Sequence, residues 1–133
     1  MPFVLDASVA AVWGLADESS QMADNAAERL KTEIALVPRL WWYEIRNLLI
    51  VNERRQRLTP ADTAIFLDLL SAYPIQFEQA EDEIAILRLA RIYQLSFYDA
   101  AYLALALKRQ VPLATLDKPL RAAASVAGVP LLA

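Results

Sequence analysis

Short apolar runs alternate with longer amphipathic segments along the whole chain. The runs predict five strands, at residues 3–5, 34–37, 74–77, 112–116 and 129–132. The segments between them have apolar residues at helical spacing and predict helices at residues 8–18, 20–31, 40–57, 60–73, 79–93, 97–109 and 118–127. Because the strands are mostly apolar and one or two helices separate them, we expect an α/β fold with a parallel sheet covered on both faces. The 133 residues are expected to form a single domain, 1–133.

Two carboxylates directly follow predicted strands. Asp6 comes after residues 3–5, and Asp117 comes after residues 112–116. Ligands of open parallel sheets bind beyond the carboxyl ends of the strands, so we expect both residues at one edge of the sheet, as neighbours if their strands are adjacent. The alternative for each residue alone is a structural one, in which it caps the following helix, where Ser8 is a further capping residue.

A third carboxylate lies within an apolar helix stripe. Glu44 follows Trp41 by three residues and precedes Leu48 by four, so it shares a helix face with them. A buried carboxylate needs a partner, a proton or a cation. A salt bridge to Arg39 or Arg46 is the alternative to a role as a cation ligand.

The fourth carboxylate begins the most apolar predicted helix. Asp99 precedes the uninterrupted apolar run 100–107, which suggests that this helix is buried and that its first turn faces the sheet edge. Residues 96–99, Ser-Phe-Tyr-Asp, also match a capping box with Asp in place of Glu. A capping role and a ligand role for Asp99 are compatible.

The chain lacks several residue types on which common catalytic and binding sites depend. The chain has no His and no Cys, which excludes the commonest general base, thiolate nucleophiles and zinc-thiolate sites. Its only glycines, Gly14 and Gly128, cannot form a glycine-rich phosphate loop. The net charge of −3 argues against a broad basic face for duplex DNA. Acid and base chemistry therefore falls to carboxylates.

Convergence of these four carboxylates would require a cation or raised pKa values. At an effective dielectric of about 20, two charges 4 Å apart repel by about 4 kcal/mol, a large part of a typical domain stability of about 5–15 kcal/mol. A ligand set made only of oxygen atoms favours Mg²⁺ or Mn²⁺. Mg²⁺ commonly shares its coordination sphere with substrate phosphates, so phosphodiester hydrolysis is the expected chemistry.

Membrane insertion and secretion are not expected. Hydrophobic residues make up 57% of the chain, but the longest apolar run, 100–107, is far shorter than the roughly 20 residues that span a bilayer. The chain starts directly with its first strand, without the pattern of a signal peptide. Together with the absence of Cys, this favours a cytoplasmic protein.

Four short motifs resemble those of one known family. They are Val-Leu-Asp-Ala-Ser at 4–8, Tyr-Glu-Ile-Arg-Asn at 43–47, Tyr-Asp-Ala-Ala-Tyr at 98–102 and Thr-Leu-Asp at 115–117, with acidic residues 38, 55 and 18 positions apart. In this order the motifs resemble the PIN-domain ribonucleases, and in particular the VapC-type toxins of toxin–antitoxin pairs. The resemblance covers essentially the whole chain.

The resemblance implies a fold, an activity and a set of site residues. The implied fold is a three-layer α/β/α sandwich with a central five-stranded parallel sheet. The implied activity is Mg²⁺-dependent cleavage of single-stranded RNA by an endoribonuclease toxin that a small antitoxin neutralises. Asp6, Glu44, Asp99 and Asp117 would be the catalytic and metal-binding acids, with Ser8, Thr115 and Asn47 in support.

Aromatic and basic residues suggest further contacts. Residues 41–43, Trp-Trp-Tyr, cannot all face one core, so at least one ring should be exposed and bind an antitoxin or a second copy of the chain, and a homodimer is expected. The candidate phosphate contacts are Arg46, Arg54, Arg55, Arg57, Lys108, Arg109, Lys118 and Arg121, although solvated helix faces explain most of them.

Two alternative functions are kept open. A non-catalytic PIN-like RNA-binding adaptor would share the fold but lack acidic ligands. A phosphate-accepting receiver-type domain would need an acidic pair near the first strand and a lysine after a late one, and no second acid stands next to Asp6.

Overall fold

The computed structural model describes residues 1–133 and contains a four-stranded parallel sheet. The strands are β1 (Phe3–Leu5), β2 (Ala35–Val37), β3 (Ile75–Phe77) and β4 (Leu113–Ala114), in the spatial order β3-β2-β1-β4. The backbone pairs Val4 with both Leu36 and Leu113, so β1 is central. All residues of β1, β2 and β4 are buried, as expected for strands covered on both faces.

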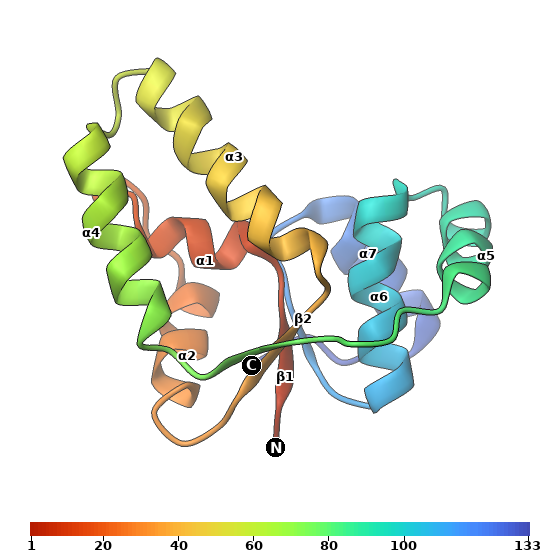
Figure 1. Cartoon of the computed structure of the whole chain (residues 1–133). Coiled ribbons are helices and arrows are strands. Elements are labelled where there is room, and N and C mark those ends of the chain that lie inside the picture. Colours follow the sequence, from red (N-terminus) through yellow and green to blue (C-terminus); the bar gives the residue numbers. More distant parts are fainter.

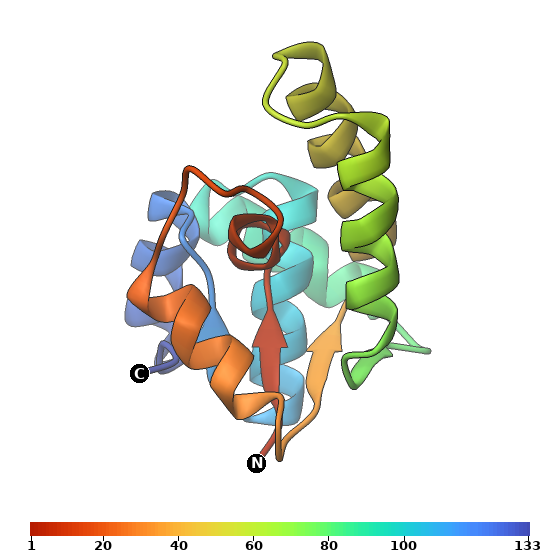
Figure 2. The same ribbon diagram turned by 90° about the vertical axis from the view of Figure 1, so that its left-hand side faces the viewer.

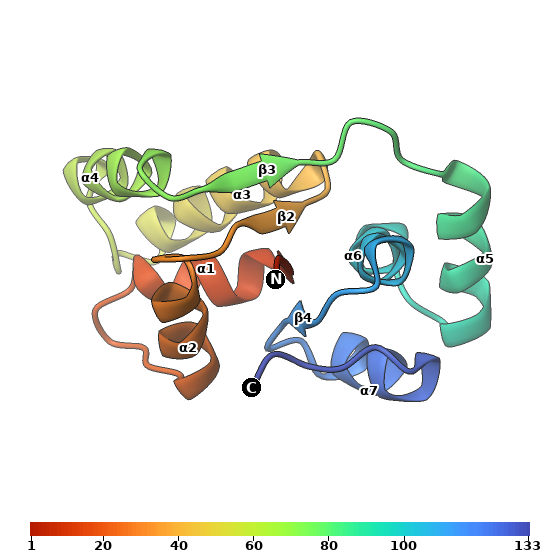
Figure 3. The same ribbon diagram turned by 90° about the horizontal axis from the view of Figure 1, so that it is seen from below.

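Helices cover both faces of this sheet. The helices α1 (Ala7–Trp13), α2 (Gln21–Arg29), α3 (Leu40–Arg54) and α4 (Pro60–Ser71) lie on one side, as Figures 1 and 3 show. The other side has α5 (Glu83–Tyr93), α6 (Phe97–Arg109) and α7 (Lys118–Ala127). The three-layer α/β/α prediction is therefore confirmed. Helices α3 and α4 extend past the end of the sheet as an arm, visible in Figure 2.

The predicted fifth strand is wrong. Residues 129–132 make only one parallel bridge, between Leu131 and Leu113, in which the Leu113 amide donates to the Pro130 carbonyl at 2.9 Å. Pro130 has no N–H to donate, so it cannot continue a ladder of hydrogen bonds. The sheet thus has four strands and a bridge where five strands were expected.

The first helix is shorter than its sequence pattern predicts. It ends at Trp13, and Gly14 follows in close contact with the ring of Phe66 on α4. A Cβ at residue 14 would lie 3.0 Å from that ring, so any other residue would require the ring to shift by a few tenths of an ångström. None of the helices combines the length and apolar character needed to cross a bilayer.

The carboxyl ends of β1 and β4 lie side by side. The parallel pairing of Leu5 with Ala114 brings Asp6 and Thr115, the residues that follow, to the same edge of the sheet. The Asp6 amide donates to the Ala114 carbonyl at 2.9 Å, which extends this pairing by one hydrogen bond. The two strands are therefore adjacent, which is the condition under which Asp6 and Asp117 were expected to be neighbours.

Candidate functional site

A cavity of about 230 Å³ lies beyond the carboxyl ends of β1 and β4. Its lining comes from the residue after β1 and the start of α1, from α3, from the first turn of α6 and from the N-cap of α7. The polar lining residues are Asp6, Ser8, Glu44, Asn47, Asp99 and Asp117. All four predicted acids therefore meet at one cavity, and no basic side chain lines it.

Asp6 is the most deeply buried of these acids. Only 5% of its surface is exposed, and its Oδ2 accepts hydrogen bonds from the hydroxyls of Ser8 and Thr115, both at 2.7 Å. Asp6 precedes α1 but makes no side-chain capping bond, and Ser8 lies inside the helix, so the predicted cap by Ser8 is wrong. The Ser8 hydroxyl instead fixes the orientation of the Asp6 carboxylate.

Thr115 connects Asp6 to the neighbouring acid. Its side chain is fully buried, and its Oγ1 accepts a hydrogen bond from the Asp117 amide at 3.1 Å. The Leu116 amide donates to Ser8 Oγ at 3.0 Å, which ties the exit of β4 to α1. The two hydroxyls thus hold the ends of β1 and β4 in register, as well as orienting Asp6.

Asp117 caps α7, the structural role considered for it above. Its Oδ2 accepts from the Leu120 amide at 3.0 Å, which commits that oxygen to the helix N-terminus. Its carboxylate also lines the cavity. Capping and cavity lining therefore coexist in one side chain.

Asp99 lies in the first turn of α6, three residues after the N-cap Ser96, and has a different environment. The Ser96 hydroxyl accepts from the Asp99 amide at 3.1 Å, which is half of the expected capping box. The Ser96 amide does not donate back to the Asp99 carboxylate, so the box is incomplete, and the carboxylate lines the cavity.

Glu44 is held by tyrosine and makes no salt bridge. The Tyr102 hydroxyl of α6 donates to Glu44 Oε1 at 2.5 Å, and neither Arg39 nor Arg46 pairs with this carboxylate. The predicted arginine alternative is therefore wrong. The sequence does not reveal this role of Tyr102, because the residue lies within the apolar run 100–107, where an aromatic side chain indicates only core packing.

The pKa values of three acids reflect this crowding without a counter-charge. Burial, followed by the charges of neighbouring carboxylates, raises the pKa of Glu44 and of Asp99 above their ordinary values. Burial also raises the pKa of Asp6, and the Asp117 charge adds to it, against the opposing hydrogen bonds from Ser8 and Thr115. The site is strained electrostatically as long as no cation balances it.

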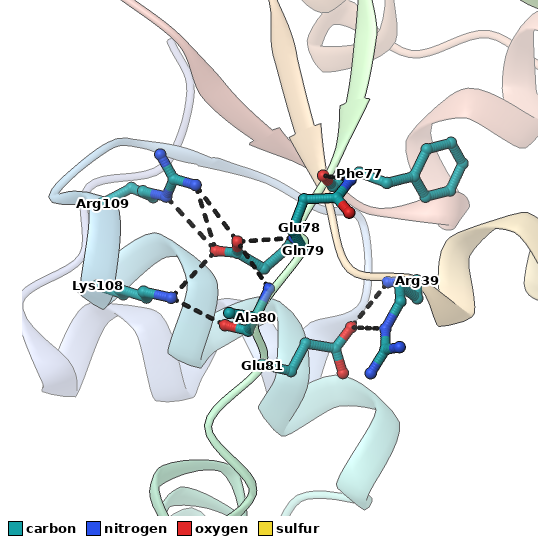
Figure 4. Close-up of polar contacts among 8 residues, drawn as sticks. All are labelled: Arg39, Phe77, Glu78, Gln79, Ala80, Glu81, Lys108 and Arg109. Atoms are coloured by element: carbon teal, nitrogen blue, oxygen red, sulfur yellow. Dashed lines mark hydrogen bonds and ion pairs between the residues drawn. The ribbon is translucent and has the colours of Figure 1, made fainter.

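A buried acid elsewhere in the fold provides a contrast. Glu78 directly follows β3 and is 7% exposed, but Arg109 donates to it at 3.3 Å and Lys108 lies 3.5 Å from it (Figure 4). Burial alone would raise the pKa of Glu78, but the hydrogen bonds from Arg109 and the Ala80 amide hold it below its usual range. Protein cations thus satisfy Glu78, whereas none reaches the four acids of the cavity.

The donor set of the cavity fits a hydrated divalent ion. No three acidic side chains form a preassembled group around one position. Mg²⁺ retains several waters and commonly uses one or two carboxylates directly, so carboxylates spread around a small cavity suit it. Asp6, Asp99, Asp117 and Glu44 are the residues that could hold such an ion.

The predicted basic contacts mostly have structural partners. Arg57 pairs with Asp17 at 2.8 Å, Arg109 with Glu78, and Arg121 donates to the Thr115 carbonyl at 3.0 Å. These residues therefore stabilise the fold. Of the aromatic run, Trp41 is buried, whereas Trp42 and Tyr43 are 45% and 72% exposed, which confirms that the three rings do not share one core.

Two solved structures are similar to this one over most of its length. PAE2754 from Pyrobaculum aerophilum has a TM-score of 0.71 and 24% identity, with 92% of this chain and 87% of that chain covered. VapC20 of Mycobacterium tuberculosis, described as a sarcin-ricin loop cleaving toxin, has a TM-score of 0.61 and 15% identity, with 91% and 94% covered. At these identities the likeness concerns the fold.

A family model gives the assignment. No curated protein matches the sequence. The model of the PIN domain matches residues 3–126, from β1 to the last turn of α7 and including all four acids of the cavity. This chain belongs to the PIN domain family.

Proposed function

We propose that this protein is a divalent-metal-dependent endoribonuclease that cleaves single-stranded RNA. The observation that supports the proposal is the convergence of Asp6, Glu44, Asp99 and Asp117 on one cavity that has no basic side chain. Carboxylates alone can neither attract nor stabilise a phosphate, so such a site requires Mg²⁺ or Mn²⁺ for phosphoryl chemistry.

Each residue of the cavity has a proposed role. Asp6, Asp99 and Asp117, with Glu44, hold one or two ions, and Ser8 and Thr115 keep Asp6 in its ligating orientation. When bound, a divalent ion neutralises negative charge on the scissile phosphate and lowers the pKa of the attacking water. Glu44 orients that water and accepts its proton, and Asn47 lines the path of the substrate.

The test is cleavage of a labelled single-stranded RNA with Mg²⁺, with Mn²⁺ and with a chelator. We expect cleavage only with the metals, and its loss in Asp6→Asn and Asp99→Asn. Asp68→Asn, on the exposed face of α4, is the matched control and should retain full activity. Metal-dependent RNA binding without cleavage would favour the adaptor function instead. The absence of any lysine from the cavity lining argues against a receiver-type domain.

We also propose that the protein is a cytoplasmic toxin, a homodimer and the target of a small antitoxin. Support comes from the exposed aromatic surface of α3, where the Arg46 guanidinium lies 3.8 Å from the centre of the Trp42 ring and the Tyr43 ring packs edge-on at 5.0 Å. Exposed aromatic and arginine side chains are enriched at protein interfaces. Light scattering of the chain alone and with the product of its neighbouring gene tests both partners, and a monomer in both samples would refute them.

A further inference from the structure

The Tyr102 hydroxyl is the one hydrogen-bond donor that reaches Glu44. Tyr102 lies on α6 and Glu44 lies on α3, 58 residues earlier, and the O–O distance is 2.5 Å. The Tyr102 side chain is fully buried, whereas Glu44 is half-buried. The contact therefore joins a core residue of α6 to a side chain of α3, a helix on the other side of the sheet, and that side chain lines the cavity.

This hydroxyl has a fixed role as a donor. A phenol ordinarily loses its proton only near pH 10, so at neutral pH the Tyr102 hydroxyl carries the proton that it donates to Glu44. A buried O–H group must donate to some acceptor, and Glu44 Oε1 is the acceptor it has. One carboxylate oxygen of Glu44 is thus committed, and only Oε2 is left without a protein partner.

We propose that Tyr102 is a positioning residue for Glu44: by holding Oε1, it leaves Oε2 in one fixed orientation to accept a hydrogen bond from the attacking water. This inference rests on the proposed ribonuclease function. Glu44 has no arginine or lysine partner that could replace the tyrosine, and a glutamate free to rotate would lose the alignment that general base catalysis requires. Tyr102 does not contact RNA, because it has no exposed surface.

The first test is Tyr102→Phe, which removes the hydroxyl and keeps the ring in the core. We expect kcat to fall about 10- to 100-fold, the range typical for loss of a partner that orients a ligating side chain, with KM unchanged. The melting temperature of the metal-free protein should fall by no more than about 5 °C. Tyr73→Phe, whose hydroxyl makes no hydrogen bond in the fold, is the matched control and should leave kcat unchanged.

A second readout does not depend on cleavage. We expect the Mn²⁺ affinity of Tyr102→Phe, measured by calorimetry, to fall about 10-fold, and the same substitution to have no further effect in a Glu44→Ala background. An unchanged kcat in an active enzyme, equal losses of Mn²⁺ affinity in both backgrounds, or a collapse of stability that accounts for the lost activity would each overturn the proposal. If the wild type does not cleave RNA, the proposed function fails, and the Mn²⁺ comparison still decides the role of Tyr102.

Discussion

Replacing Asp99 by Asn should make the metal-free protein more stable while it abolishes the activity. The Asp99 backbone N–H donates to the Ser96 hydroxyl and would still do so in the variant, and the side-chain oxygen of Asn can accept from the same hydroxyl. Burial, then the charges of Asp117 and Asp6, raises the pKa of Asp99. The substitution thus removes repulsion and preserves the local contacts.

The cavity sets the magnitude of this effect. Carboxylates on different sides of a cavity of this size can lie about 8 Å apart, and two charges at that separation repel by about 1–2 kcal/mol at an effective dielectric of about 20–40. Because Asp99 is half-exposed and solvent screens its interactions with both Asp6 and Asp117, we expect a total gain of about 1–2 kcal/mol at pH 7. This corresponds to about 3–8 °C in melting temperature.

The pH dependence of the stability gives a separate test of the sign of the Asp99→Asn effect. A folded-state pKa above 3.8 means that the folded protein binds the proton more tightly, so ionisation of Asp99 costs stability as pH rises from 3.8 through the raised value. The gain from Asp99→Asn should therefore be present at pH 7 and vanish below about pH 3.8. Saturating Mg²⁺ should reverse the order of stability, because a ligand at about 100 times its Kd stabilises the wild type by about 2.7 kcal/mol.

The assay is urea denaturation of the metal-free proteins across pH, with Asp62→Asn as the matched control. Asp62 has the same position in α4 as Asp99 in α6, but its carboxylate accepts from the Thr59 amide at 2.9 Å, and this bond lowers its pKa. Asp62→Asn should therefore lower stability at pH 7, opposite in sign to Asp99→Asn. A loss of stability in Asp99→Asn without metal would refute the electrostatic reasoning about the cavity.

Three further substitutions test other parts of the structure by denaturation. Thr115→Val removes the 2.7 Å hydrogen bond to Asp6 inside the core and should cost about 1–3 kcal/mol; a neutral result would mean that the hydroxyl does not hold this carboxylate. Glu78→Gln weakens the buried pair with Arg109 and should cost about 1–3 kcal/mol of stability at pH 7. The cost should be small in acid, because the lowered pKa of Glu78 stabilises the folded protein fully above the unfolded-state value of 4.5 and this stability is lost as the pH falls. An equal cost at both pH values would contradict the ion pair. Gly128→Ala should cost about 1 kcal/mol although its Cβ would meet no atom, because the backbone φ is +80°; no change would contradict backbone strain.

The sequence predicts most of the fold because its strands are short apolar runs with clear ends. The bounds of α6 and α7 are predicted to the residue, since Ser96 and Gly128 mark a start and an end by local backbone chemistry. The first helix is overestimated because its apolar spacing continues beyond Trp13, whereas the helix ends at the C-cap Gly14. The fifth strand fails because one proline interrupts its hydrogen bonding.

The candidate site, like the fold, could be predicted from the sequence only in part. The rule for strand ends predicts the position of Asp6 and Asp117, but the same rule also applies to Glu78, which follows β3. Glu78 differs from Asp6 and Asp117 because it has a cationic partner, Arg109, which is 31 residues away in the sequence. No local sequence pattern reveals this pair. Tyr102 is missed for the same reason, because its hydroxyl has a role only once the fold brings it to Glu44, 58 residues earlier in the sequence.

A crystal of the protein soaked in Mn²⁺ and measured at the manganese absorption edge would test the central claim most directly. We predict an anomalous peak inside the cavity lined by Asp6, Glu44, Asp99 and Asp117, and its loss in Asp99→Asn. Active enzyme whose manganese lies elsewhere, or a peak that Asp99→Asn leaves unchanged, would contradict it.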